Sequence, residues 1–229
     1  MGLDRPLRRL IPSVARITYN PVFRGTVGAA DFFPGRLYRE FRKLPPNYLR
    51  CRVGVGNRLF ANQVHFLTVG EPFWLSSLAE GYLQLDGTVI ELGCGPGRFA
   101  HHLRDLDYYG TRFTGRYLGV DIDEDAIAWC RANFDPERFT FHLSPHTSAT
   151  YMPGRQATAE RSRLPVDDST VDFVYAHSLV THLLEPELRN YLEEAARVLK
   201  PGRRAVLSCF CLDLEGVKRL DRHTFRHRM

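Results

Sequence analysis

The stretch VIELGCGPGRF, residues 89–99, decides the fold of the chain. A short apolar run enters a turn that contains Gly93, Gly95 and Gly97, and a helical pattern follows the turn. Glycine permits positive φ angles and lets a ligand approach the backbone closely. The first amides of the following helix present unpaired donors and the positive end of the helix dipole to an anionic group. The stretch therefore predicts a strand, a ligand-binding turn and a helix.

Short apolar runs and helical patterns alternate from this stretch onward. The pattern predicts strands over residues 88–92, 116–121, 138–142, 171–176 and 203–210, and helices over 97–106, 124–134 and 186–198. Strands that are apolar throughout are typical of a parallel sheet with helices on both faces. We expect a doubly wound, mostly parallel α/β domain, in which ligands bind at the carboxyl ends of the strands.

The first 85 residues show a different pattern. Helical spacing of apolar residues over 36–44, 57–70 and 72–83 predicts a mostly helical cap. Residues 1–60 hold twelve Arg or Lys against three acids, a charge of +9, whereas the whole chain carries +5. This basic segment indicates either a solvated surface or a lid that attracts an anionic substrate or partner. We expect a cap over 1–85 and a ligand-binding domain over 86–229.

The composition of the 229 residues is that of an ordinary globular protein, without an apolar run long enough for a membrane-spanning helix. The five cysteines are odd in number and scattered, which is typical of a reducing compartment. No histidines and acids have metal-ligand spacing. We expect a cytoplasmic protein that binds no metal and no membrane, while the Arg-rich first residues leave an organellar address as an alternative.

The residues around the turn narrow the choice of ligand. A P-loop would need Gly-Lys-Ser/Thr, but residues 97–99 are Gly-Arg-Phe. The third glycine is out of place for a nicotinamide fingerprint, which weakens the hypothesis of an NAD-dependent oxidoreductase without removing it. Asp121 ends the next strand, where nucleoside-binding units place a carboxylate that accepts both ribose hydroxyls. Its alternative role is the N-cap of the following helix, for which Asp123 is equally suited.

Four segments in this order resemble class I S-adenosylmethionine-dependent methyltransferases of the bacterial small-molecule type. They are VIELGCGPGRFAHHL (89–103), YLGVDIDEDAI (117–127), LPVDDSTVDFVYAHSLVTHL (164–183) and EEAARVLKPGRRAVLSCF (193–210). The resemblance covers roughly residues 85–211 and implies a Rossmann-like methyltransferase fold. Four linked motifs are more specific than a glycine-rich turn by itself.

The resemblance implies that S-adenosylmethionine is the cofactor. The glycine turn and the helix start would face its methionine carboxylate, Glu91 would lie near its amino group directly or through water, and Asp121 would hold its ribose. Glu160 falls where the family often carries an acid that contacts adenine, with a solvated loop acid as the alternative. The full set of implied contacts is Glu91, Gly93, Cys94, Gly95, Gly97, Asp121, Ile122, Glu160, Ala176 and His177.

Methyl transfer from a sulfonium is an in-line displacement, so a base is needed only when the acceptor is a hydroxyl or a protonated amine. His182 and His177 follow the predicted strand 171–176, near the transferred methyl, and histidine titrates in the useful range. We therefore take both as candidate catalytic residues. The alternative for His182 is a helix face that packs inward. By resemblance, Asp172 has a structural role.

The acceptor is the least determined part of the prediction. We expect O- or N-methylation of a small molecule, such as a sugar or a secondary metabolite, and the basic cap suits an anionic one. The aromatic residues of the cap keep an RNA or protein methyltransferase as an alternative, but known RNA-binding patterns are absent, so nucleic acid is not favoured.

The segment after the predicted strand 203–210 departs from the family. Members continue with a helix and an antiparallel strand pair, whereas this chain has about twenty further residues. An open sheet edge promotes aggregation, so we expect the cap, a second copy in a homodimer or a partner subunit to cover it. The same departure raises the alternative of a catalytically idle subunit that binds cofactor and needs a partner for turnover.

Overall fold

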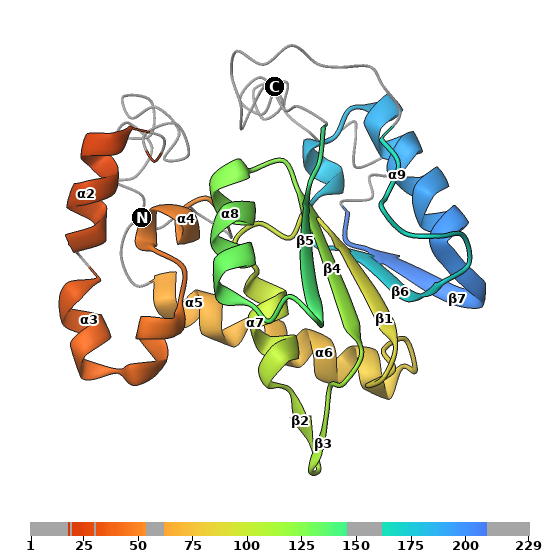
Figure 1. The fold of residues 1–229 in the computed structure, drawn as a ribbon, viewed down its shortest axis with the longest axis horizontal. Coiled ribbons are helices and arrows are strands. Elements are labelled where there is room, and N and C mark those ends of the chain that lie inside the picture. Colours follow the sequence, from red (N-terminus) through yellow and green to blue (C-terminus); the bar gives the residue numbers. More distant parts are fainter. Residues whose placement is uncertain (1–17, 19, 30, 54–61, 146–161, 210–229) are drawn as a thin grey trace, which may run out of the picture.

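A five-stranded sheet forms the centre of the protein. The computed structural model describes residues 18, 20–29, 31–53, 62–145 and 162–209. The sheet has the order β5-β4-β1-β6-β7, and every neighbouring pair is parallel (Figure 1). Its strands are β1 (Thr88–Leu92), β4 (Arg116–Asp121), β5 (Phe139–Leu143), β6 (Val171–Ala176) and β7 (Leu199–Leu207). The predicted doubly wound α/β fold is therefore confirmed.

Helices cover both faces of the sheet. On one face, side chains of α6 (Gly70–Ala79), α7 (Arg98–Asp105) and α8 (Glu124–Asn133) pack against alternate strand residues such as Val89 and Phe173. On the other face, α9 (Glu185–Val198) packs against residues such as Ile90 and Val174. Because successive strand residues point to opposite faces, an apolar core on both sides requires the continuous apolar runs seen in the sequence.

The last strand begins earlier than predicted. The pattern indicated residues 203–210, but β7 starts at Leu199, directly after α9 ends. The pairing with β6 shifts between Val171, which lies opposite Leu199, and Phe173, which lies opposite Arg204. The LKPG residues (199–202) therefore belong to β7 and form a bulge-like irregularity in it, where Gly202 has a φ of 78°.

A two-stranded hairpin was not predicted. It consists of β2 (Asp107–Tyr108) and β3 (Thr111–Arg112), and all four residues are exposed. Strands this short bury no apolar face, so they leave no alternation in the sequence. The hairpin projects away from the sheet (Figure 1).

The amino-terminal part is helical, with bounds that differ from the predicted ones. Its elements are α2 (Pro21–Ala29), α3 (Phe32–Leu37), the 3-10 helix η2 (Arg39–Lys43), α4 (Asn47–Arg50) and α5 (Asn62–Thr68). The predicted helix over 36–44 is wrong, because Tyr38 is extended with a φ of −125° and Leu37 is 77% exposed. Of the three apolar residues that set the helical spacing, Leu44 is buried, Phe41 is half-buried and Leu37 is exposed. Within the described ranges, no helix has the length and apolar character needed to cross a bilayer.

The boundary between cap and domain at residue 85 stays a prediction, and α6 bears on it. Trp74 of α6 is fully buried in the core beneath the sheet, and its indole Nε1 donates to the Phe99 carbonyl at 2.9 Å. A helix that we assigned to the cap thus supplies core residues to the ligand-binding domain.

Asp172 connects three strands at the amino-terminal end of the sheet. Its Oδ2 accepts from the Thr88 amide of β1 at 3.0 Å, and Lys200 Nζ of β7 donates to both carboxylate oxygens at 2.9 and 2.8 Å. Burial alone would raise the pKa of Asp172, but these donors hold it below its usual value. The structural role implied for this residue agrees with these contacts.

Replacing Asp172 should therefore destabilise the fold. In Asp172→Ala, the Thr88 amide and Lys200 lose their acceptor, and we expect a loss of about 2 to 3 kcal/mol in the free energy of unfolding, measured by urea denaturation. Asp168→Ala is the matched control, because Asp168 pairs with Arg197 at the surface and is 63% exposed. Equal stability of Asp172→Ala and the control would contradict the structural role.

Candidate functional site

The glycine turn leaves β1 and hooks over the end of the neighbouring strand β4. The amides of Gly93 and Cys94 both donate to the Val120 carbonyl, at 2.7 and 3.1 Å. Gly93, Gly95 and Gly97 have φ angles of 77°, 51° and 76°, which other residues adopt only with strain. The backbone conformation predicted for this turn is thus present at all three glycines.

Each glycine is also packed against a different part of the protein. A Cβ atom at Gly93 would lie 3.1 Å from Leu179, one at Gly95 would lie 2.9 Å from Val53, and one at Gly97 would lie 3.1 Å from the Cys130 sulfur. Leu179 follows β6, Val53 belongs to the amino-terminal part, and Cys130 is in α8. Three segments therefore meet at the turn, and side chains there would push them apart.

Asp121 is bonded directly to the glycine turn. Its Oδ2 accepts from the Gly95 amide at 2.6 Å, and its Oδ1 accepts from the Asp123 amide at 2.8 Å. Burial raises the pKa of Asp121 to about 6, against the effect of these amides. Each carboxylate oxygen has two lone pairs, so each retains one acceptor site. The alternative N-cap role falls to Asp123, whose side chain accepts from the Asp125 and Ala126 amides.

Glu91 lies in the core and not at the surface of the turn. It is 1% exposed, and its Oε2 accepts from the hydroxyls of Tyr117 and Tyr175, the latter at 2.6 Å. Burial raises the pKa of Glu91 to about 8, while the two hydroxyls act in the opposite direction. Its contact with the amino group of the cofactor stays a prediction.

The other predicted cofactor residues are spread around the turn. The Cys94 side chain is buried against Gly119 of β4, so only its backbone belongs to the turn surface. Ile122 is half-buried directly after β4. Ala176 ends β6, and its carbonyl accepts from the Ser208 amide at 2.9 Å. Glu160 lies outside the described residues.

The two candidate catalytic histidines have different surroundings. His177 follows β6 and is half-buried, with its ring centroid 4.9 Å from that of Phe99 in α7. Burial lowers its pKa, and Arg98 adds to the effect. His182 lies in the short 3-10 helix η3 (Val180–His182) and is exposed, so it does not pack inward as the alternative required. Of the two, His177 is the one that contacts α7, the helix after the turn.

Sequence reasoning missed how the basic amino-terminal part contacts the start of α8. Arg52 Nη1 donates to both carboxylate oxygens of Asp123 at 2.8 and 2.7 Å, and its Nη2 donates to Asp125 at 3.0 Å. Arg24 binds Asp125 as well, at 2.5 Å, and both guanidinium groups lie over the Tyr48 ring. The acidic run at 121–125 and the basic segment before residue 60 were visible in the sequence, but not that they pair.

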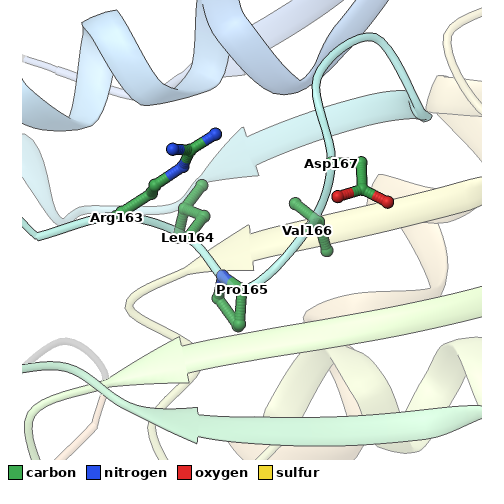
Figure 2. Close-up of a pocket in the computed structure, with 5 residues that line it drawn as sticks. All are labelled: Arg163, Leu164, Pro165, Val166 and Asp167. Carbon is green, nitrogen blue, oxygen red and sulfur yellow. The ribbon is translucent and has the colours of Figure 1, made fainter.

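The segment before β6 borders a hollow. It is lined by the consecutive residues Arg163, Leu164, Pro165, Val166 and Asp167, in the segment that leads into β6 (Figure 2). Of the predicted site residues that the structure describes, none is among its lining residues. In the described part of the chain, no three His, Cys, Asp or Glu side chains are grouped in a way that could hold a metal ion.

The buried carboxyl of Glu91 should make stability depend on pH. Because its pKa is about 8 in the folded chain and near 4.5 in the unfolded chain, its protonated form stabilises the fold fully at low pH. Relative to Glu91→Gln, which keeps an acceptor for the tyrosines but cannot ionise, the wild type should lose about 1.4 kcal/mol per pH unit between pH 5 and 8. Urea denaturation of both proteins at each pH tests this, and parallel pH curves would contradict it.

Comparisons with known proteins agree with this geometry. A family model described as a methyltransferase domain matches residues 90–207. An uncharacterized methyltransferase of Mycobacteroides abscessus is 29% identical over 66% of this chain and 48% of its own length. An arsenite methyltransferase of Aquipseudomonas alcaligenes is 31% identical over 52% of this chain and 31% of its own length. The chain spans about half or less of these relatives.

Among solved structures, an S-adenosylmethionine-dependent methyltransferase from Mesorhizobium loti is 19% identical with a TM-score of 0.42, covering 62% of this chain and 54% of that one. The family match begins at Ile90 in β1 and ends at Leu207, the last residue of β7. It therefore includes the glycine turn and all of the sheet except the first two residues of β1. The chain belongs to the methyltransferase domain family, which confirms the predicted resemblance to methyltransferases.

Proposed function

We propose that this chain binds S-adenosylmethionine at the carboxyl ends of β1 and β4 and transfers its methyl group to a small-molecule acceptor. The observation that carries the proposal is the hydrogen bond from the Gly95 amide to Asp121. It joins the turn that would receive the amino-acid end of the cofactor to the carboxylate that would hold its ribose. These two groups are the ends of one nucleoside-binding surface.

The residues at the turn fit this cofactor. S-adenosylmethionine has a diol and a carboxylate but no phosphate, and Asp121 retains one acceptor site on each oxygen for the two hydroxyls. The glycines of the turn have the positive φ angles of a ligand-binding loop, and the sequence after the turn lacks the Lys of a phosphate loop. A dinucleotide would bring a pyrophosphate for which the glycine spacing is out of place.

The bound cofactor would supply a methyl group on a positively charged sulfur, which is the reactive centre. The work of the protein is to align the acceptor with it, and alignment can contribute about 7 to 11 kcal/mol to the barrier reduction. Asp121 and the glycine turn fix the nucleoside end. His177 lies after β6 with a lowered pKa, so it is neutral at pH 7 and able to take a proton from an acceptor hydroxyl. His182 remains a second candidate base.

The amino-terminal residues would form the acceptor side of the site. Val53 packs on Gly95, and Arg52 binds the acids that follow Asp121, so this segment lies over the turn. A segment that covers the turn in this way, here called the roof, leaves less room for a macromolecule and therefore favours a small acceptor. The charges of Arg24 and Arg52 are already paired, so an anionic acceptor would depend on other basic residues.

A catalytically idle subunit is the second candidate function, and one observation favours it. In the described part of the chain, β7 is an edge strand with β6 as its one partner. An exposed parallel edge is normally covered. A second copy or a partner subunit that adds its own strand there would complete the sheet, and turnover would then require both chains.

The proposed role of Asp121 predicts a loss of cofactor binding. Asp121→Ala removes the ribose acceptor, and we expect the affinity for S-adenosylhomocysteine to fall by about 100-fold in calorimetric titration, a cost of about 3 kcal/mol. Asp135→Ala is the control, because Asp135 lies in the exposed turn before β5. NAD should bind neither protein. Binding of NAD and not of S-adenosylhomocysteine by the wild type would overturn the proposal.

The proposed roof predicts a second result. Arg52→Met leaves Asp123 without its partner, and breaking a buried ion pair costs about 3 kcal/mol, so the opened population of the amino-terminal segment should rise by about 100-fold. Chymotrypsin should then cleave within residues 18–53 much faster than in the wild type. Arg36→Met is the control, because Arg36 contacts only the exposed Phe32 ring among the contacts described. Equal cleavage rates would contradict the anchoring role.

A further inference from the structure

Arg98, the first residue of α7, has an environment that the fold does not explain. It directly follows Gly97, and 8% of the residue is exposed. Its Nε atom is buried and has no hydrogen-bond partner. The one contact that its guanidinium makes among the described residues is with the ring of Phe99, at 5.1 Å from the centroid. No carboxylate of the described residues forms an ion pair with it.

Such an arrangement is costly in a folded protein. An arginine that is this deeply buried normally pairs with an acid and uses its five donors. The other buried arginines of this chain follow that rule, since Arg50 binds Asp31 and Asn62 and Arg52 binds Asp123. Burial lowers the pKa of Arg98, which is the sign of the same cost. A buried cation without an anion therefore points to a partner that is not part of the protein.

The neighbours of Arg98 locate the missing anion. Its charge acts on Glu91 of β1, Tyr175 of β6 and His177. These residues lie at or near the carboxyl ends of the two central strands, next to the glycine turn. Glu91 forms no ion pair with Arg98, and it is mostly protonated at neutral pH because burial raises its pKa to about 8, although the two tyrosine hydroxyls act in the opposite direction. Arg98 directly follows the glycine turn, so this position belongs to the proposed cofactor site.

We infer that Arg98 binds the carboxylate of the amino-acid end of S-adenosylmethionine and so makes this carboxylate a requirement for tight binding. The inference rests on the proposed function and adds a residue that binds the carboxylate of the cofactor. A planar guanidinium can donate two parallel hydrogen bonds to a carboxylate, and in a buried site such a pair is stronger than at the surface. The helix start that Arg98 opens adds its dipole in the same direction.

The test compares two ligands that differ only in the carboxylate. Wild type and Arg98→Met are titrated calorimetrically with S-adenosylmethionine and with its decarboxylated form, without acceptor. Methionine keeps the apolar contact with Phe99 and removes the charge. The wild type should bind the decarboxylated form about 10- to 100-fold more weakly. Arg98→Met should lose most of this difference, because only the helix start then favours the carboxylate. Arg98→Lys should recover part of the difference.

The melting temperature of the unliganded proteins shows whether Arg98→Met is folded. If Arg98 is an unpaired buried charge, Arg98→Met should melt at the same temperature as the unliganded wild type or higher. Arg104→Met on the same helix is the control, because Arg104 pairs with Asp105 and should leave both affinities unchanged. A lower melting temperature together with equal weakening towards both ligands would show a structural role and overturn the inference.

The outcomes separate this inference from the proposed function. Wild-type affinity of Arg98→Met for S-adenosylmethionine, with binding by the wild type intact, would overturn the role of Arg98 and leave the proposed function standing. A wild type that binds neither ligand would overturn both. A carboxylate that belongs to the acceptor instead would leave both titrations of Arg98→Met equal to those of the wild type, which also overturns the inference.

Discussion

The hydrogen bond between the Gly95 amide and Asp121 is the contact on which the site depends. It ties the turn after β1 to the end of β4, and both amides before it are already bound to Val120. The positive φ angles of the glycines, the close packing of Val53 on Gly95 and the entry of α7 all follow from where this bond holds the chain. The carboxylate therefore shapes the turn, and in the proposed function its remaining lone pairs accept from the ribose hydroxyls.

Two of the ionisable side chains buried around this bond have their charge compensated, one by an ion pair and the other by protonation. Arg52 is matched by the acids at the start of α8, and Glu91 is neutralised by a proton and satisfied by two tyrosine hydroxyls. Among the described residues, Arg98 has no such compensation, because no acid forms an ion pair with it. The contrast matters because the three residues lie around one turn, so the cost of the unmatched charge cannot be assigned to general features of the core. It is local to the site.

The sheet was predictable from sequence because apolar strands of a parallel sheet have a strong and simple pattern. The bounds of β1, β4 and β6 were predicted to the residue, and the glycine turn and Asp121 indicated the site. The amino-terminal helices were less predictable. The helical spacing over 36–44 would place Leu37 on a buried face, but Leu37 is exposed to solvent. The surroundings of Glu91 were also out of reach, since its partners Tyr117 and Tyr175 come from two strands that only the sheet order brings together.

The order of the strands has a consequence for how the chain is made. β1 lies in the centre of the sheet between β4 and β6, and its residue Val89 pairs with Tyr117 on one side and Phe173 on the other. On the ribosome, β1 therefore emerges well before either neighbour, and its second edge stays unpaired until the chain has been extended past residue 176. Long-range parallel pairing of this kind is slow. Until it forms, β1 exposes the apolar side chains of Val89, Ile90 and Leu92 on both of its faces. A central strand that is buried at four of its five residues in the finished protein is thus one that a nascent chain must shield until β6 has been made.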